Sequence, residues 1–79
     1  MKLLVRNLAK TSTEQDIRQW FNAYGTVAEC TLVRDHETGH SKGFGFVVMP
    51  DETEAKAAMQ ALNLTSQHKS KIRVKVAQS

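Results

Sequence analysis

Two phenylalanines alternate with two glycines in KGFGFVVM, the stretch that occupies residues 42–49. Flat aromatic side chains stack on unpaired nucleic-acid bases, and a basic side chain beside them pairs with phosphate. Glycine in a strand costs about 0.5 to 1 kcal/mol relative to alanine, so two glycines in one strand require a reason. The elements around this stretch decide whether Phe44 and Phe46 face solvent or the core.

The composition indicates one small domain with a modest positive charge. A chain of 79 residues builds a single thin core, and we expect one domain over residues 1–79. The net charge of +3 favours an anionic partner only weakly. With Cys30 as its one cysteine the chain forms no internal disulfide, and it lacks a signal-peptide pattern and a membrane-length apolar run. We expect a monomer without cofactor or membrane contact, cytoplasmic by default, with the nucleus as the alternative.

Two segments carry the signals of helices. Residues 13–25 begin with Thr13 as an N-cap and Asp16 three residues later, the spacing of a capping box. A stripe at helical spacing leads to Gly25, where a glycine C-cap belongs: Ile17, Trp20, Phe21 and Tyr24. Residues 51–63 start with acids and present a face of smaller residues: Ala55, Ala58, Met59 and Leu62.

Four segments have the patterns of strands. They are residues 2–8, 27–33, 42–49 and 71–77, with polar loops at 34–41 and 64–70. The order is βαββαβ, and right-handed crossovers place both helices on the same face of one sheet. The predicted fold class is therefore α+β, a ferredoxin-like sandwich with a four-stranded antiparallel sheet and one bare face.

Alternation along the strands assigns each side chain to the helix side or to the bare side. Gly43 and Gly45 fall on the helix side, where we expect them to make room for Trp20 and Phe21. The two phenylalanines of the same stretch then face solvent. The last strand is expected to turn three aliphatic residues toward the helices: Ile72, Val74 and Val76.

The same alternation gathers positive charge on the bare side. Seven of the eleven basic residues fall on it or on its rim: Lys2, Arg6, Lys42, Lys69, Lys71, Arg73 and Lys75. Five of the eight acids fall on the two predicted helices instead: Glu14, Asp16, Asp51, Glu52 and Glu54. Cations around exposed aromatic rings are what a single strand of nucleic acid requires.

Two short stretches resemble the signatures of the RNA recognition motif family, and the resemblance covers nearly the whole chain. KGFGFVVM fits the longer signature, K/R-G-F/Y-G/A-F-V-x-F/Y, except at its last position, where Met49 replaces an aromatic residue. LLVRNL at residues 3–8 fits the shorter signature, with Leu4 in place of an aromatic residue. The start at Met1, just before the first strand, is similar to that of small single-domain members from bacteria and some plants.

The resemblance implies a protein that binds single-stranded RNA, in RNA regulation or processing, and that is not an enzyme. It assigns packing between sugars and bases to Phe44, base stacking to Phe46 and a phosphate contact to Lys42. Leu4 offers a base a weaker, aliphatic contact. Single-stranded DNA is a second expected ligand, because base stacking does not involve the 2′-hydroxyl that distinguishes RNA from DNA. The predicted RNA-binding residues are Lys2, Leu4, Arg6, Lys42, Phe44, Phe46, Arg73, Lys75 and Ala77.

Other interpretations of these residues have less support. A protein partner for the two rings would have to accept a ring of basic side chains at the centre of its interface. Small hydrolases of similar architecture have an arginine-bearing glycine loop after the first strand, and residues 7–10 contain no glycine. His36 and His40 have no third metal ligand nearby, and Cys30 has no histidine placed to activate it.

Overall fold

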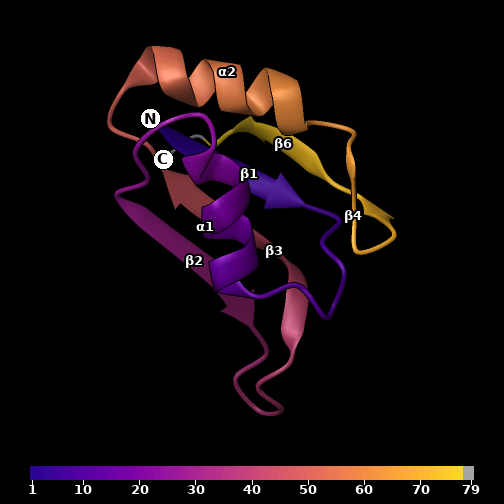
Figure 1. Ribbon diagram of the computed structural model, residues 1–79. Coiled ribbons are helices and arrows are strands. Elements are labelled where there is room, and N and C mark those ends of the chain that lie inside the picture. Colours follow the sequence, from indigo (N-terminus) through magenta and orange to yellow (C-terminus); the bar gives the residue numbers. More distant parts are fainter. Residues whose placement is uncertain (78–79) are drawn as a thin grey trace.

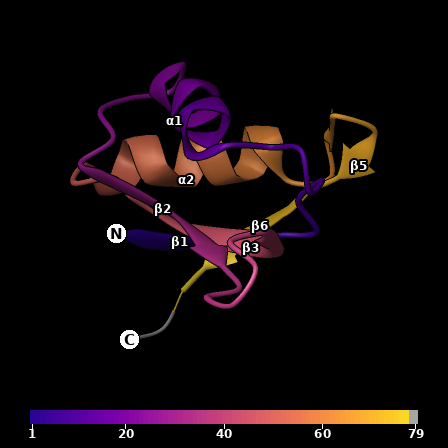
Figure 2. The same cartoon turned by 90° about the horizontal axis from the view of Figure 1, so that it is seen from below.

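The computed structural model describes residues 1–77, so the last two residues of the expected domain, 78–79, lie outside the described residues. Four strands form one antiparallel sheet in the order β2 (Glu29–Arg34), β3 (Ser41–Val48), β1 (Lys2–Arg6) and β6 (Arg73–Val76). Helices α1 (Glu14–Asn22) and α2 (Glu52–Leu62) cover the same face of this sheet, as Figures 1 and 2 show. The predicted α+β fold is confirmed. Within residues 1–77 neither helix is long and apolar enough to cross a membrane.

The core lies between the sheet and the two helices. Its largest fully buried side chains come from α1, from the strands of the main sheet and from residues that directly flank them: Phe21, Leu3, Ile17, Met49, Ile72, Val5 and Val47. Helix α2 contributes a flatter face of Ala55, Ala58 and Leu62, as the sequence predicts. Within residues 1–77 both helices lie on this side, so no helix covers the opposite face of the sheet.

Helix α1 begins as its capping signal predicts. The Thr13 hydroxyl accepts a hydrogen bond from the Asp16 N–H at 3.1 Å, and the Asp16 carboxylate accepts one from the Thr13 N–H at 3.0 Å. The helix ends at Asn22, with Ala23 as its C-cap, so Gly25 lies beyond the end of the helix. The apolar stripe is correspondingly shorter than predicted, because Tyr24 has left the helix and is 39% exposed.

The first turn of α1 also occupies the outer edge of strand β2. The Glu14 carboxylate accepts a hydrogen bond from the Leu32 N–H at 2.9 Å, and the Cys30 thiol donates to the Glu14 carbonyl at 3.5 Å. Burial raises the pKa of the Cys30 thiol, with nearby Arg18 lowering it and Glu14 raising it further. A half-buried thiol of this kind is a packing residue and not an activated nucleophile.

The glycines of strand β3 are explained by the backbone of the sheet and not by packing against the helices. A β-carbon on Gly45 would overlap the carbonyl oxygen of Thr31 and lie 3.2 Å from the Cα of Leu32 in the adjacent strand. Gly43 has a φ of +85°, a backbone conformation that side chains other than glycine rarely adopt. The expectation that both glycines make room for the aromatic residues of α1 is therefore wrong.

The chain between α2 and β6 departs from the predicted loop and strand. Strands β4 (Ser66–Gln67) and β5 (Ser70–Lys71) pair as a separate two-stranded hairpin, and the expected strand over residues 71–77 is interrupted at Ile72. The Ile72 N–H donates to the Thr65 carbonyl at 2.9 Å, which ties Ile72 to the hairpin.

The turn of this hairpin explains why the sequence did not predict it. His68 and Lys69 adopt φ angles of +51° and +69°, where glycine or asparagine is usual in a two-residue hairpin turn. The hairpin places Lys69 and Lys71 outside the strands of the main sheet, whose alternation was expected to continue through them. Lys71 still borders the end of β1, because its carbonyl accepts from the Asn7 side-chain amide.

Candidate nucleic-acid interface

The face of the main sheet opposite the helices, called the open face below, is lined by alternate residues of its four strands. Exposure alternates along β1, where Leu3 and Val5 are buried and Leu4 between them is half-exposed, and the same alternation continues in β3. Ala77 joins the open face just after β6, where its N–H donates to the Lys2 carbonyl at 2.9 Å. The structure thus brings every predicted site residue to one surface: Lys2, Leu4, Arg6, Lys42, Phe44, Phe46, Arg73, Lys75 and Ala77.

Two aromatic rings stand at the centre of the open face. The rings of Phe44 and Phe46 meet edge to face, with centroids 6.3 Å apart and planes at 86°. The ammonium group of Lys2 lies 4.5 Å from the centroid of Phe46, a cation–π contact. A base that stacks on this side of Phe46 has to share the ring with the Lys2 ammonium or displace it.

No cation of the open face forms an ion pair within residues 1–77. The ion pair there is Glu52 with Lys56, and the Asp16 carboxylate contacts the His68 ring; neither involves an open-face residue. Arg6 and Arg73 are direct cross-strand partners between β1 and β6. Like charges directly opposite one another destabilise a sheet, so this pair lowers stability until an anion lies between them.

Three hollows follow one another across the open face. The ring hollow, of about 330 Å³, is lined by Leu4, Arg6, Phe44 and Phe46. The terminal hollow, of about 500 Å³, lies on the other side of Leu4 and Phe46 and is lined by these two residues with Lys75, Val76 and Ala77. The loop hollow, of about 340 Å³, is lined by Arg6, Asn7, Leu8, Lys10, Lys42, Gly43 and Phe44.

Three residues of these hollows were not predicted from the sequence. Val76 is the cross-strand partner of buried Leu3 and so lies on the helix side as expected, but at the end of an edge strand it is 43% exposed and also borders the terminal hollow. Asn7 adopts a φ of +59°, and its side-chain amide donates to the Lys71 carbonyl, so it turns the chain out of β1. Lys10 reaches the loop hollow from the segment after this turn. An asparagine at a strand end is the one sequence signal that pointed to this turn.

Leu4 is the position at which the open face is least equipped for stacking. It is the cross-strand partner of both Phe46 and Lys75 and lines the ring and terminal hollows. Replacing Leu4 with phenylalanine should raise the affinity for a single-stranded oligonucleotide by about fivefold or more, because stacking contributes about 1 to 3 kcal/mol per base. Fluorescence anisotropy measures the change. Leu4→Met, which keeps the volume without a ring, is the control, and equal affinities for the two variants would contradict a base subsite at this position.

A metal centre has no support in the described part of the chain. Residues 1–77 contain no group of three or more histidine, cysteine, aspartate or glutamate side chains that is placed to hold a metal ion. His36 and His40 both lie in the exposed loop between β2 and β3.

Comparisons with known proteins agree with the signatures and the fold. The model of the family described as RNA recognition motif matches residues 3–73. Glycine-rich RNA-binding protein 1 of Mycosarcoma maydis is 38% identical over 78 residues, which make up 99% of this chain and 45% of that protein. The chain spans less than half the length of the curated relatives that it matches.

Solved structures give the same result. The crystal structure of RNA binding protein PG1 has a TM-score of 0.96 and 37% identity, and the match covers 100% of this chain and 95% of that one. The structure of an Sxl-lethal protein/RNA complex has a TM-score of 0.94 and 28% identity, covering 99% of this chain and 47% of that one. The chain therefore belongs to the RNA recognition motif family, whose members are binding domains and not enzymes.

Proposed function

We propose that this domain binds a short segment of single-stranded RNA across the open face. The observation that carries the proposal is the placement of Phe44 and Phe46, two half-exposed rings on an uncovered sheet, among cations without an acidic partner in residues 1–77. A ring without a covering layer offers its flat face to an unstacked base, and every base has a flat face to stack. In this arrangement Phe46 stacks one base, and Phe44 packs between a base and a sugar.

The phosphates of the strand are assigned to the cations around the rings. Arg6 and Arg73 line a hollow together with Asn7, and a phosphate between the two guanidinium groups removes their mutual repulsion. Lys42 lies at the end of the loop hollow and Lys75 at the terminal hollow, on opposite sides of the rings. Lys2 contacts a phosphate once a base takes its place over Phe46. Leu4 and Ala77 complete the apolar floor of the terminal hollow.

Relatives support the same assignment. The relative from Mycosarcoma maydis is named as an RNA-binding protein, and the Sxl-lethal structure, which has nearly the same fold, is a complex with RNA. We propose RNA regulation or processing as the cellular setting, a monomer as the binding unit and the cytoplasm as its location. Single-stranded DNA is a further proposed ligand, because ring stacking and phosphate pairing are common to both nucleic acids.

A protein ligand on the open face is the second candidate, and the basic residues argue against it. The centres of protein interfaces are depleted of charge, and the rings here are bordered by Lys2, Arg6 and Lys75.

Titration of the ¹⁵N-labelled domain with a mixed-sequence RNA oligonucleotide tests the proposal. We expect amide shifts to concentrate on β1, β3, β6 and Ala77, while amides on the outer side of α1 and α2 stay unmoved. A matched double-stranded RNA of the same length is the control, since its bases are not available for stacking. No shift on the open face at any RNA concentration, or shifts confined to the helices, would contradict it.

A further inference from the structure

Two arginines face each other at one end of the open face. Arg6 ends β1 and Arg73 begins β6, and the two residues are direct cross-strand partners. The β-carbons of such partners lie about 5 Å apart on the same face of the sheet, so both guanidinium groups can reach one small anion. Together with Asn7 they line a hollow of about 390 Å³, called the arginine hollow below.

The two positive charges of the arginine hollow are not offset by an acid. No histidine, aspartate or glutamate lines the hollow, and neither arginine forms an ion pair within residues 1–77. In this part of the chain Glu29 is the one acid on the four strands of the main sheet. It pairs with Val48, which in turn pairs with Lys2 at the opposite end of β1. An anion in the hollow therefore meets the full charge of both arginines.

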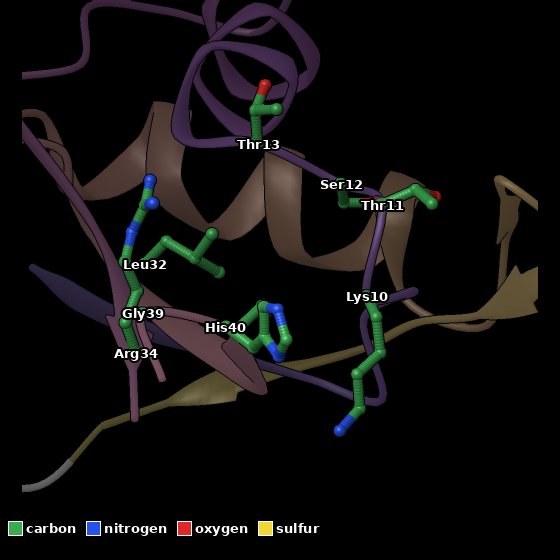
Figure 3. A pocket seen from close by; sticks show the side chains of 9 residues that line it. Lys10, Thr11, Ser12, Thr13, Leu32, Arg34, Gly39 and His40 are labelled. Atoms are coloured by element: carbon green, nitrogen blue, oxygen red, sulfur yellow. The ribbon is translucent and has the colours of Figure 1, made fainter. Parts of the chain in front are cut away.

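The cations of a neighbouring hollow are arranged differently. Figure 3 shows Lys10 and Arg34 on opposite walls of the hollow before α1, with the ring of His40 between them. These side chains come from segments that are not paired with each other, whereas Arg6 and Arg73 start from directly opposite positions on paired strands. Convergence of two cations on one point is therefore a property of the arginine hollow.

A phosphate at the end of an RNA strand matches this charge better than a phosphate within the strand. A phosphate between two nucleotides is a diester with one negative charge. A terminal phosphate is a monoester, which carries about 1.5 to 2 negative charges at pH 7 and has three oxygens that accept hydrogen bonds. Each planar guanidinium donates two parallel hydrogen bonds to such a group. Two arginines thus balance a monoester, but they leave one positive charge over when the ligand is a diester.

A surface for the base of the terminal nucleotide adjoins the arginine hollow. Arg6 also lines the ring hollow, together with Leu4, Phe44 and Phe46. A terminal nucleotide can therefore stack its base on the rings while its phosphate lies between the arginines. The paired part of β1 and β6 ends at these arginines, so the open face offers no further paired residues of the two strands beyond them.

We infer that the arginine hollow binds the terminal phosphate of an RNA strand, at its 5′ or its 3′ end. The inference rests on the proposed function of the open face and names the class of RNA that this face binds best, a single strand with a phosphorylated end. Arg6 and Arg73 are then the residues that distinguish such a strand from one with hydroxyl ends, because the hydroxyl group brings no charge to the pair.

Three forms of one RNA of about four nucleotides test the inference. One has hydroxyl groups at both ends, one has a 5′-phosphate and one has a 3′-phosphate. We expect one phosphorylated form to bind the wild-type domain about three- to tenfold tighter than the hydroxyl form, as measured by fluorescence anisotropy of a label on the protein. The end that gives this gain identifies the source of the phosphate.

Two variants with the same loss of charge locate the gain. Arg73→Gln should reduce it to less than about twofold, while thermal unfolding should show a folded domain, because the substitution removes a pair of like charges. Lys75→Gln removes one charge from the terminal hollow and should weaken all three forms without removing the gain.

The dependence on pH gives a second measurement. In the wild-type domain the gain should fall as the pH is lowered from about 7.5 to about 5, because a terminal phosphate loses its second charge near pH 6. Arg6 and Arg73 are the charged residues that line the hollow, and arginine keeps its charge over this range. The hydroxyl form, measured at each pH, corrects for titration elsewhere in the domain.

The outcomes separate this inference from the proposed function. If the wild-type domain binds none of the three forms, the proposed function itself fails. If it binds all three with equal affinity, or if the gain persists in Arg73→Gln, the arginine hollow is not a site for a terminal phosphate and the open face still stands as an RNA-binding surface.

Discussion

Replacing Phe46 with alanine is expected to lower the affinity of the domain for single-stranded RNA by roughly 5- to 100-fold. The ring of Phe46 is shared by two hollows of the open face and touches both Phe44 and Lys2, so it is the central stacking surface. Loss of base–aromatic stacking removes about 1 to 3 kcal/mol per base, and each 1.4 kcal/mol is about tenfold in affinity. Anisotropy of a labelled oligonucleotide of about eight nucleotides measures the effect.

The controls for this experiment separate stacking from folding. Tyr24→Ala removes a partly exposed ring beyond the end of α1, on the helix side of the sheet, and should leave affinity unchanged. Thermal unfolding of the Phe46 variant should remain cooperative, since Phe46 is not part of the buried core. A folded Phe46 variant that binds RNA as tightly as wild type would refute the stacking role.

Replacing Gly45 with alanine is expected to destabilise the fold by about 3 kcal/mol, a large share of the stability of a domain this small. The added methyl group would meet the backbone of strand β2 at Thr31 and Leu32. A flexible side chain rotates away from such a contact, but a hydrogen-bonded strand does not. The β2–β3 pairing would therefore have to open locally, and this pairing borders Phe46, whose cross-strand partner is Thr31.

Chemical denaturation of the glycine variants measures this cost. Gly39→Ala is the matched control, because Gly39 has a φ of +78° and a β-carbon there would have no neighbour within 4 Å. It should lose only about 1 kcal/mol, from backbone strain alone. If Gly45→Ala proves no more destabilising than Gly39→Ala, the close approach of β2 does not determine the choice of glycine in β3.

The composition of the open face could be predicted from the sequence because a strand alternates its side chains with a period of two. This alternation predicts that Phe44 and Phe46 lie opposite the helices, and the prediction requires no interatomic distance. The helix N-terminus was equally predictable, since the bonds between Thr13 and Asp16 are local. The order of elements then determined the layers, because connections of this kind have one preferred hand.

What could not be predicted depends on contacts between distant segments. The reason for Gly45 lies in the register that pairs it with Leu32, and register is a property of two strands. The turn between β4 and β5 consists of His68 and Lys69, which have positive φ angles. Histidine and lysine are not typical of such turns, so their residue types do not predict this one. The hollow beside Lys10 and Arg34 exists because the segment before α1 lies near the end of β2 and the start of β3, which are distant from it in the sequence.

The hydrogen bond from the Leu32 N–H to the Glu14 carboxylate protects part of the edge strand β2. An edge strand with free N–H groups is a template on which another chain can add a strand. Here the Glu14 carboxylate occupies the Leu32 N–H of the edge strand β2, so a strand from another chain cannot pair with that group. This edge is therefore less open to aggregation than a fully bare strand would be.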